Sequence, residues 1–408
     1  MGTETILVTG ATGNVGHHIA TRLRDEGVSV RALSRDPSSK RLPAGVTAVA
    51  GDLSRPDSLR DAAADADVAF LLWPFLSAEG ANMAVAALAG QVRRIVYLSA
   101  ISVHDSAPPE ENGVWGRVER AIEESGAQWT FLRAGGFATN ALAWADQIRS
   151  QGVVRWAYGA AARSLIHERD IADVAVAVLT DDRHAGKKYV LTGPETITQA
   201  DQVAAVGEVT GLPVRWEEAP ADDIREQLAA VTGDRAFADH ALDYWASLVA
   251  EPEPVTRTVE EITGRRARSF LEWASDHAGE FRPHTPRDVV SRYVSLLRRG
   301  DIDAAVSLLS GDVLRVAPLE KAGGPAGLRG VEAIMANAQR QNAGYRIRGV
   351  DIDGPFPHRD RFAVRFCFDE VNLETGQPSV TEKMSVYAVR DGAINREDVY
   401  YHTPPHTP

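Results

Sequence analysis

Three glycines near the start of the chain have the spacing of a turn that binds phosphate groups. Gly10, Gly13 and Gly16 follow an apolar run, 6–8, that predicts a buried strand. Glycine lets the backbone come close to a pyrophosphate, and the start of a helix offers N–H groups and the positive end of its dipole. Because the glycines lie where a strand should turn into a helix, they predict a dinucleotide site. Its expected members are Gly10, Thr12, Gly13, Asn14, Val15 and Gly16.

The second predicted strand, 28–33, ends in residues that could select between NAD and NADP. An acidic residue at this place favours NAD, whereas an arginine can accommodate the 2′-phosphate of NADP. Ser34 and Arg35 end the strand and Lys40 lies nearby, so the sequence favours NADP(H). The alternative is that Arg35 is an ordinary surface charge.

A third short strand, 46–50, is followed by Asp52 and Leu53, which we expect beside the adenine. The Asp52 carboxylate could accept a hydrogen bond from the adenine amino group. Aspartate is also a common capping residue, so a purely structural role is the alternative.

The side chains that could act on a substrate lie farther along the chain. Ser99 ends a predicted strand, where it would lie beside the nicotinamide, although such a serine can also cap the next turn. Arg117 follows in a predicted helix; an arginine can hold an oxyanion but does not readily give up a proton. Gly135 comes directly after the sixth predicted strand, close to where nicotinamide and substrate should meet. The expected pocket wall consists of Trp73, Phe137, Asn140, Trp144 and Tyr158, and Phe137 is also expected at the cofactor.

These residues require a doubly wound α/β sheet to bring them together. Val15, Ile19 and Leu23 recur at helical spacing after the glycine turn. The runs 67–72 and 94–99 are continuously apolar, as expected for parallel strands that are covered on both faces. The alternation of strands and helices therefore predicts a Rossmann-type sheet.

Composition limits the classes of function. The chain has 408 residues and a formal net charge of −12, which argues against a nucleic-acid partner. Its single cysteine, Cys367, excludes an intramolecular disulfide and a cysteine metal cluster, and we expect no metal site. The longest apolar run, 68–76, is too short to cross a membrane, and no signal sequence is recognised, so we expect a cytoplasmic protein.

A second domain is predicted after a proline-marked joint at 281–286, which gives domains of 1–281 and 282–408. An amphipathic helix with Val289, Val290 and Leu296 inward comes first, and three long strands follow at 347–352, 362–368 and 383–389. Asp391-Gly392 between two alternating runs predicts a hairpin. Helices followed by an antiparallel sheet indicate an α+β cone.

The first domain resembles the NmrA-like group of atypical short-chain dehydrogenases/reductases. The resemblance rests on the glycine turn and on the motifs 34–37, 51–53, 95–99 and 130–137, and it covers about residues 3–281. It implies that the sheet binds NADP(H) and that the segments after Phe137 shape a lobe with the substrate pocket.

One feature of ordinary short-chain reductases is missing. They have a Tyr-x-x-x-Lys pair in which the tyrosine donates a proton, but this chain has no tyrosine between Tyr97 and Tyr158. In the expected place stands the run 114–119, with Arg117 as its basic residue.

The second domain resembles the SnoaL-like branch of the NTF2-like superfamily over about residues 285–405, on the order of its elements and the hairpin at 384–394. That superfamily includes polyketide cyclases, isomerases and non-catalytic binding or dimerisation modules, so the resemblance implies a homodimer through this domain. Asp398 on the last strand is the candidate acid or base, with Tyr293, Glu382 and His402 as its candidate neighbours. A shift of one residue would turn Asp398 outward, so an exposed strand residue is the alternative.

We therefore predict an NADPH-dependent oxidoreductase of the atypical short-chain type. Its substrate would be a small apolar or aromatic, polyketide-like metabolite of secondary metabolism, and the second domain would bind or further convert the product. One alternative is a non-catalytic NADP(H)-binding redox sensor or scaffold. The other is a cofactor-assisted cyclase, isomerase or epimerase without net redox chemistry.

Overall fold

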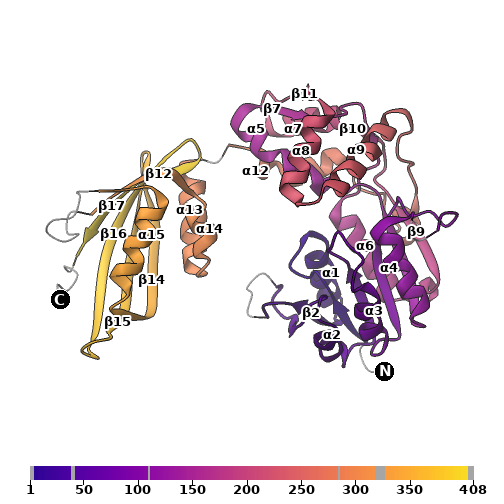
Figure 1. Ribbon diagram of the computed structural model, residues 1–408, viewed down its shortest axis with the longest axis horizontal. Coiled ribbons are helices and arrows are strands. Elements are labelled where there is room, and N and C mark those ends of the chain that lie inside the picture. The colour runs from indigo at the N-terminus through magenta and orange to yellow at the C-terminus, as the bar shows by residue number, and fades with distance from the viewer. Residues whose placement is uncertain (1–3, 38–41, 109–110, 284, 318–326, 403–408) are drawn as a thin grey trace. The chain divides into compact units, whose positions relative to one another are not determined.

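The chain forms two compact units, 1–282 and 283–408 (Figure 1). The structure is a computed structural model that describes residues 4–37, 42–108, 111–283, 285–317 and 327–402. Each unit has its own sheet and its own apolar core, so we describe each by itself.

Within the described ranges, the first unit is built on a seven-stranded parallel sheet with the order β3-β2-β1-β4-β5-β6-β9. The order reverses between β1 and β4, which makes the switch point at which such sheets bind ligands. The strands are β1 (Thr5–Val8), β2 (Ser29–Ser34), β3 (Thr47–Ala50), β4 (Val68–Leu72), β5 (Arg94–Ala100), β6 (Gln128–Ala134) and β9 (Lys187–Leu191).

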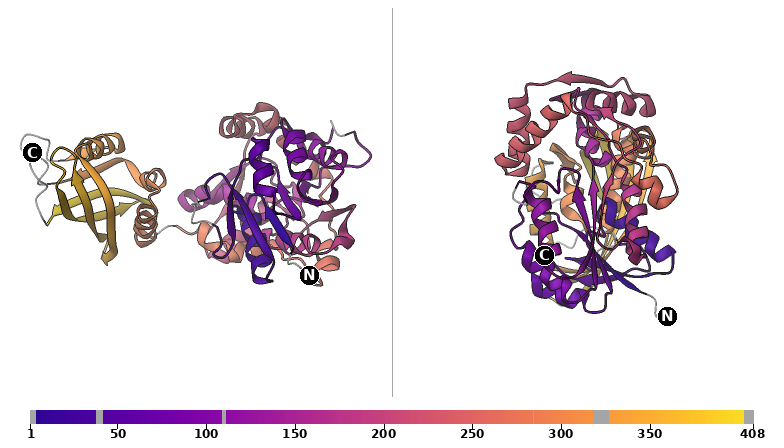
Figure 2. Two further views of the ribbon diagram at one scale, coloured as in Figure 1. Left: turned by 90° about the horizontal axis from the view of Figure 1, so that it is seen from below. Right: turned by 90° about the vertical axis from the view of Figure 1, so that its right-hand side faces the viewer.

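Helices cover both faces of this sheet, as Figure 2 shows for the indigo and purple strands. Alternate side chains of each strand pack on opposite faces: Val96 and Leu98 lie in one core cluster, and Ile95 and Tyr97 in the other. The predicted doubly wound fold is therefore confirmed. Its helices are α1 (Asn14–Asp25), α2 (Pro56–Ala63), α3 (Ala81–Ala89), α4 (Gly113–Glu124), α6 (Glu168–Leu179), η2 (Asp182–His184) and α10 (Thr258–Thr263).

A lobe of helices and short strands lies beyond the carboxyl ends of the strands. In it β7 pairs with β11 in parallel and β8 with β10 in antiparallel fashion, and Trp144, Phe270 and Trp273 belong to its core. The elements are η1 (Ala138–Trp144), α5 (Ala145–Gln151), β7 (Val153–Trp156), β8 (Ala162–Arg163), β10 (Ile197–Thr198), α7 (Gln199–Thr210), β11 (Arg215–Glu218), α8 (Ala221–Thr232), α9 (Arg235–Ala250), α11 (Phe270–Asp276) and α12 (Ala278–Phe281).

The second unit is the predicted α+β fold. In its described part a six-stranded mixed sheet has the order β13-β12-β17-β16-β15-β14, and α13 packs on one face through Val289, Val290 and Val294. The strands are longer than predicted. The elements are α13 (Pro286–Arg298), α14 (Ile302–Val306), β12 (Leu309–Val316), β13 (Leu328–Arg329), α15 (Val331–Asn342), β14 (Tyr345–His358), β15 (Arg361–Asn372), β16 (Pro378–Arg390) and β17 (Ala393–Tyr401).

Local chemistry explains the clearest boundaries of this unit. Thr285 and Asp288 form a capping box that starts α13 directly after the linker. Asp391 and Gly392 both have positive φ, +52° and +76°, as the tight hairpin between β16 and β17 requires. Among the described residues, no helix is long and apolar enough to span a bilayer.

Candidate nucleotide and substrate site

The turn between β1 and α1 has the backbone geometry of a phosphate cradle. Gly10 has φ +65°, which favours glycine, and its carbonyl accepts a hydrogen bond of 2.9 Å from the Gly13 N–H. A Cβ on Gly16 would lie 2.2 Å from the Gly10 oxygen, so α1 can approach the turn this closely only with glycine there. No side chain caps α1 at Gly13, and its first turn has no acidic residue, so the helix start suits an anion. Thr12 and Asn14 are exposed on the turn, whereas Val15 is buried beneath it.

Arg35 lies at the end of β2 as predicted. It is exposed, and it makes no hydrogen bond or ion pair with any residue that the structure describes. Its guanidinium is therefore available to a ligand phosphate. Ser34 instead closes a local turn through a 2.8 Å bond from its Oγ to the Asp36 carbonyl, and Lys40 lies outside the described residues.

Asp52 is engaged within its own loop. Its Oδ1 accepts hydrogen bonds from the Ser54 N–H, at 2.9 Å, and from the Ser54 hydroxyl, at 2.8 Å. These bonds lower the pKa of Asp52, and the charge of Arg35 contributes to the shift. Asp52 therefore closes the turn before α2 but does not cap that helix, whose N-cap is Arg55, and contact of Asp52 with adenine stays a prediction. Leu53 is buried against the core of the sheet.

Ser99 is a buried hydroxyl at the carboxyl end of β5. It is 3% exposed, and its Oγ has no hydrogen-bond partner among the described residues. A buried polar atom without a partner is costly, and such atoms often mark functional sites. In register with it on β6 is Arg133, so both side chains lie on the sheet face covered by α4.

A buried ion pair that the sequence did not reveal lies at this place. Arg133 binds Glu119 of α4 through two hydrogen bonds, of 3.0 and 2.7 Å, and also binds Asp105 at 2.7 Å. Burial lowers the pKa of Arg133, but its bonds to Glu119 and Asp105 raise the pKa by more than burial lowers it. The arginine therefore stays charged. A carboxylate within the apolar stripe of a helix and an arginine within an apolar strand were the detectable signals.

Arg117 lies on the other side of α4. It is exposed and has no bonding partner in the described part of the chain, whereas Glu119 faces the sheet. The helix therefore presents Glu119, and not Arg117, to the ends of β5 and β6. A role for Arg117 in catalysis stays a prediction without a supporting contact.

The turn after β6 is fixed by a second buried carboxylate, Glu253. Its Oε2 accepts bonds from the backbone N–H groups of Gly136, at 3.4 Å, and Ser164, at 3.2 Å. Its Oε1 accepts from Arg163 Nε, at 2.9 Å, and from the Tyr244 hydroxyl, at 2.7 Å. Burial raises the pKa of Glu253, but Arg163 and Tyr244 outweigh burial and lower it. Gly135 and Phe137 were predicted here, but none of the side chains that hold them was.

The predicted pocket wall is dispersed. Trp73 is buried in the core of the sheet domain, and its indole N–H donates to the Ser77 carbonyl at 2.9 Å. Trp144 is buried in the core of the lobe, and Tyr158 packs against that core with a positive φ of +61°. Asn140 is exposed on η1, and Phe137 is half-buried beside the strand ends. Contact of these residues with a substrate stays a prediction.

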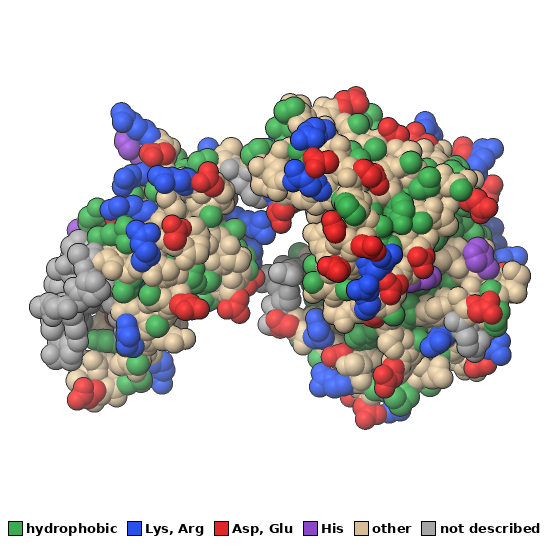
Figure 3. Space-filling model, turned by 45° about the horizontal axis from the view of Figure 1, so that its top comes forward, with side chains coloured by type: hydrophobic (Ala, Val, Ile, Leu, Met, Phe, Trp, Pro, Cys, Tyr) green, Lys and Arg blue, Asp and Glu red, His purple; other side chains and the backbone are tan. Residues whose placement is uncertain are grey.

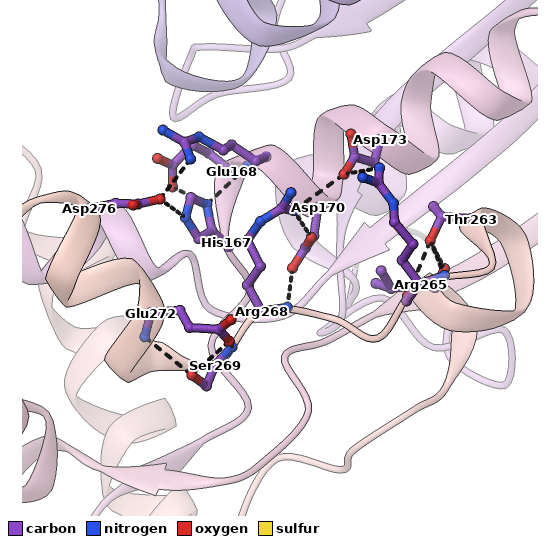
Figure 4. Close-up of polar contacts among 12 residues, drawn as sticks. His167, Glu168, Asp170, Asp173, Thr263, Arg265, Arg268, Ser269, Glu272 and Asp276 are labelled. Carbon is purple, nitrogen blue, oxygen red and sulfur yellow. Dashed lines mark hydrogen bonds and ion pairs between the residues drawn. The ribbon is translucent and has the colours of Figure 1, made fainter.

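A band of polar contacts joins the start of α6 to α11 and to the segment before it (Figure 4). Glu168 binds His277 at 2.8 Å, and Asp276 binds Arg169 at 2.7 Å and His167 at 3.4 Å. Burial raises the pKa of Glu168, but hydrogen bonds from the two histidines outweigh it and lower the pKa well below its usual range. This band anchors the last helices of the lobe to the sheet domain.

In the second unit, Glu397 and not Asp398 faces the α13 side of the sheet. Glu397 Oε1 accepts from the Ser385 hydroxyl at 2.8 Å and from the Tyr387 hydroxyl at 3.1 Å, and Tyr387 packs on Tyr293 of α13. Burial raises the pKa of both tyrosines. Neighbouring strand residues point to opposite faces, so Asp398 lies on the other face.

The alternative that Asp398 is an exposed strand residue is wrong, because Asp398 is only 6% exposed and two arginines bind it. Arg396 binds its carboxylate at 2.8 Å and Arg361 at 3.4 Å. Of the neighbours predicted for Asp398, Tyr293 lies on the α13 side and Glu382 binds Arg365 at 2.8 Å. His402 is exposed and its backbone N–H donates to Glu382.

The charges of the surface are mixed. On the face shown in Figure 3, lysine and arginine side chains alternate with aspartate and glutamate side chains over both units. No group of three or more histidine, cysteine, aspartate or glutamate residues suited to a metal ion occurs in the described ranges.

Comparison with known proteins identifies relatives of the first unit. The chain is 40% identical over 286 residues to (4-alkanoyl-5-oxo-2,5-dihydrofuran-3-yl)methyl phosphate reductase of Streptomyces griseus, covering 68% of this chain and 99% of the relative. It is 32% identical over 284 residues to NAD(P)H azoreductase of Xenophilus azovorans, with 68% and 99% coverage.

A solved structure shares the fold of the first unit. The NADPH-dependent quinone oxidoreductase of Escherichia coli superposes with a TM-score of 0.57 at 24% identity, covering 66% of this chain and 98% of that one. Residues 290–397 match the SnoaL-like domain, and residues 2–255 match the NmrA-like family. The chain therefore belongs to the NmrA-like family and carries a SnoaL-like domain after it.

Proposed function

We propose that this protein is an NADPH-dependent oxidoreductase. The observation that carries the proposal is the turn in which Gly16 packs directly against the Gly10 carbonyl, so that the start of α1 is left open for a pyrophosphate. Two relatives are named as reductases, and one of these is named for NAD(P)H, which supports hydride chemistry.

The described residues fit NADP(H). The backbone N–H groups of Asn14 and Val15 would hold the pyrophosphate, and Arg35 would bind the 2′-phosphate. When bound, the cofactor supplies a hydride. The ends of β5 and β6 then form the floor of the reacting centre, where the unpartnered Ser99 hydroxyl could donate to a substrate oxygen or to the nicotinamide amide.

We propose a small conjugated carbonyl compound of secondary metabolism as the substrate. The name of the Streptomyces relative describes an unsaturated lactone that carries an alkanoyl group and a methyl phosphate group. We also propose a cytoplasmic location, which the single unpaired cysteine, Cys367, favours.

Purified protein should oxidise NADPH in the presence of a quinone or an enone. The Arg35→Asp variant should lose about tenfold or more of the preference for NADPH over NADH, because a charge-assisted bond to the phosphate is replaced by repulsion. Arg60→Asp on the exposed side of α2 is the matched control and should leave the preference unchanged. Tight NADPH binding without turnover of any quinone, enone or ketone would contradict the proposed enzymatic function and favour the redox-sensor alternative.

We propose that the second unit binds or converts the product at the α13 side of its sheet. Glu397 with Ser385 and Tyr387 supports this, because a carboxylate held by two hydroxyl groups, with Arg315 Nε 3.6 Å away, makes a polar centre beside buried tyrosines that could orient a product. The Glu397→Gln variant should keep NADPH oxidation and lose conversion or binding of the reduced product. Asp398→Asn tests the sequence-based candidate in the same assay, and a larger effect there would refute the role of Glu397.

We also propose a homodimer through the face opposite α13. Phe356, Val380 and Tyr400 lie on this face and are 53%, 58% and 54% exposed. Light scattering should give a dimeric mass for the wild type and a monomeric mass for Phe356→Glu/Tyr400→Glu. A monomeric wild type would contradict the proposal.

A further inference from the structure

Arg163 places a guanidinium against the turn that follows β6. A Cβ on Gly136 would lie 2.5 Å from Arg163 Cζ and 2.7 Å from Nε, so the guanidinium occupies the space that a side chain at 136 would need. The turn itself is bonded to the segment after β8, since Ile166 N–H donates to the Gly136 carbonyl at 2.8 Å. Arg163 is therefore fixed relative to Gly135 and Phe137 and to the carboxyl end of β6.

The environment of Arg163 holds its orientation and leaves part of it accessible. Glu253 Oε1 receives Nε at 2.9 Å and Nη2 at 2.8 Å, and the cation lies 5.4 Å from the centre of the Tyr244 ring. The Arg163 side chain is 16% exposed, whereas that of Glu253 is 2% exposed. Nη1 makes no hydrogen bond to any residue in the described ranges.

The charge of Glu253 is also shared among other donors. Two backbone N–H groups and the Tyr244 hydroxyl bind the same carboxylate, so Arg163 is not its sole partner. The positive charge at Nη1, on the edge of the guanidinium that faces away from Glu253, is therefore compensated only in part. An arginine fixed in this way is a preorganised donor for a developing negative charge.

We propose that Arg163 binds the substrate oxygen that becomes negative during reduction, and that Glu253 and Tyr244 position it. The inference rests on the proposed reductase function. The hydride adds to the electrophilic carbon, the carbonyl electron pair moves to oxygen, and the resulting alkoxide or enolate is held by Arg163 until it takes a proton from water. Hydride and proton together account for the two-electron reduction, so no tyrosine acid is needed.

Steady-state kinetics with menadione and cyclohex-2-enone test the role in turnover. Arg163→Met should lower kcat about 100-fold, as expected for loss of an oxyanion donor, and leave the NADP⁺ affinity measured by tryptophan fluorescence unchanged. Arg163→Lys should recover part of kcat. Arg268→Met is the matched control. Arg268 also binds buried carboxylates, those of Asp170 and Asp173, but these belong to α6 and not to the turn after β6. It should lower stability and leave kcat unchanged.

A binding assay separates this inference from the proposed function. 4-Nitrophenol titrated in the presence of NADP⁺ reports, by its visible absorbance, whether the phenolate binds more tightly than the phenol. The wild type should prefer the phenolate, and Arg163→Met should lose about tenfold of that preference. Equal preference in both proteins, or no phenolate binding by the wild type, would overturn the role of Arg163. Absence of turnover by the wild type with phenolate preference intact would refute the reductase proposal alone.

Discussion

Gly16→Ala is the sharpest test of the phosphate cradle. The added Cβ would lie 2.2 Å from the Gly10 oxygen, 2.6 Å from the Gly10 carbon and 2.9 Å from the Ala11 nitrogen. All three are backbone atoms of the turn, so no flexible side chain can move aside. The start of α1 must instead shift away from β1 by about 1 Å to restore van der Waals contact.

The cost follows from this geometry. Overpacking of a well-packed site costs about 1–3 kcal/mol, which lowers the Tm of a unit of this size by several degrees. A displacement of the helix start also moves the N–H groups that would hold the pyrophosphate. We therefore expect the NADPH affinity to fall at least tenfold, more than the loss of stability by itself would produce.

Differential scanning fluorimetry and fluorescence titration with NADPH measure both effects. Gly279→Ala in α12 is the matched control, because a Cβ there meets no atom within 4 Å and its φ is not positive. Alanine should stabilise that helix slightly or leave it unchanged. Gly13→Ala, with 3.3 Å to the Gly10 oxygen, should lower Tm less than Gly16→Ala. An unchanged Tm and an unchanged NADPH affinity in Gly16→Ala would refute the cradle.

Two further predictions concern buried charge. Glu119→Ala leaves Arg133 without its main partner and should lower the free energy of unfolding by about 3 kcal/mol. The double variant Glu119→Ala/Arg133→Met should lose less free energy of unfolding than the two single variants lose in sum. Strictly additive losses in chemical denaturation would contradict a coupled pair. Glu168 has a depressed pKa in the folded state, so its stabilising effect is present above its unfolded pKa of about 4.3 and is lost as pH falls toward the folded pKa. The difference in Tm between wild type and Glu168→Gln should therefore shrink below about pH 4; a difference that grows on acidification would show that another group is responsible.

Much of the fold was predictable from local patterns. Glycine spacing, continuous apolar strands and the turn at Asp391-Gly392 depend on neighbours within a few residues, so the sequence displays them directly. The NmrA-like and SnoaL-like resemblances rest on such local motifs, and the family matches confirm both of them. The predicted strands of the second unit were too short, because cross-strand pairing extends them beyond the segments in which apolar and polar residues alternate.

The candidate site was predictable only in part. Arg35 and the glycine turn were identified because each follows a strand whose end is visible in the sequence. Glu119 and Glu253 were not, because their partners Arg133 and Arg163 lie 14 and 90 residues away along the chain. Charged residues at such separations show no common pattern until the chain is folded.

The sequence alone thus determined the dinucleotide cradle, because its strand, glycine turn and helix start follow one another directly and are brought together by local geometry. The tertiary structure decided which side chains surround the reacting centre. A helix turns Glu119 inward and Arg117 outward although only two positions separate them, and a strand directs Glu397 and Asp398 to opposite faces of its sheet. Which of two near neighbours meets the core depends on how the element packs, and that is fixed by contacts with distant segments.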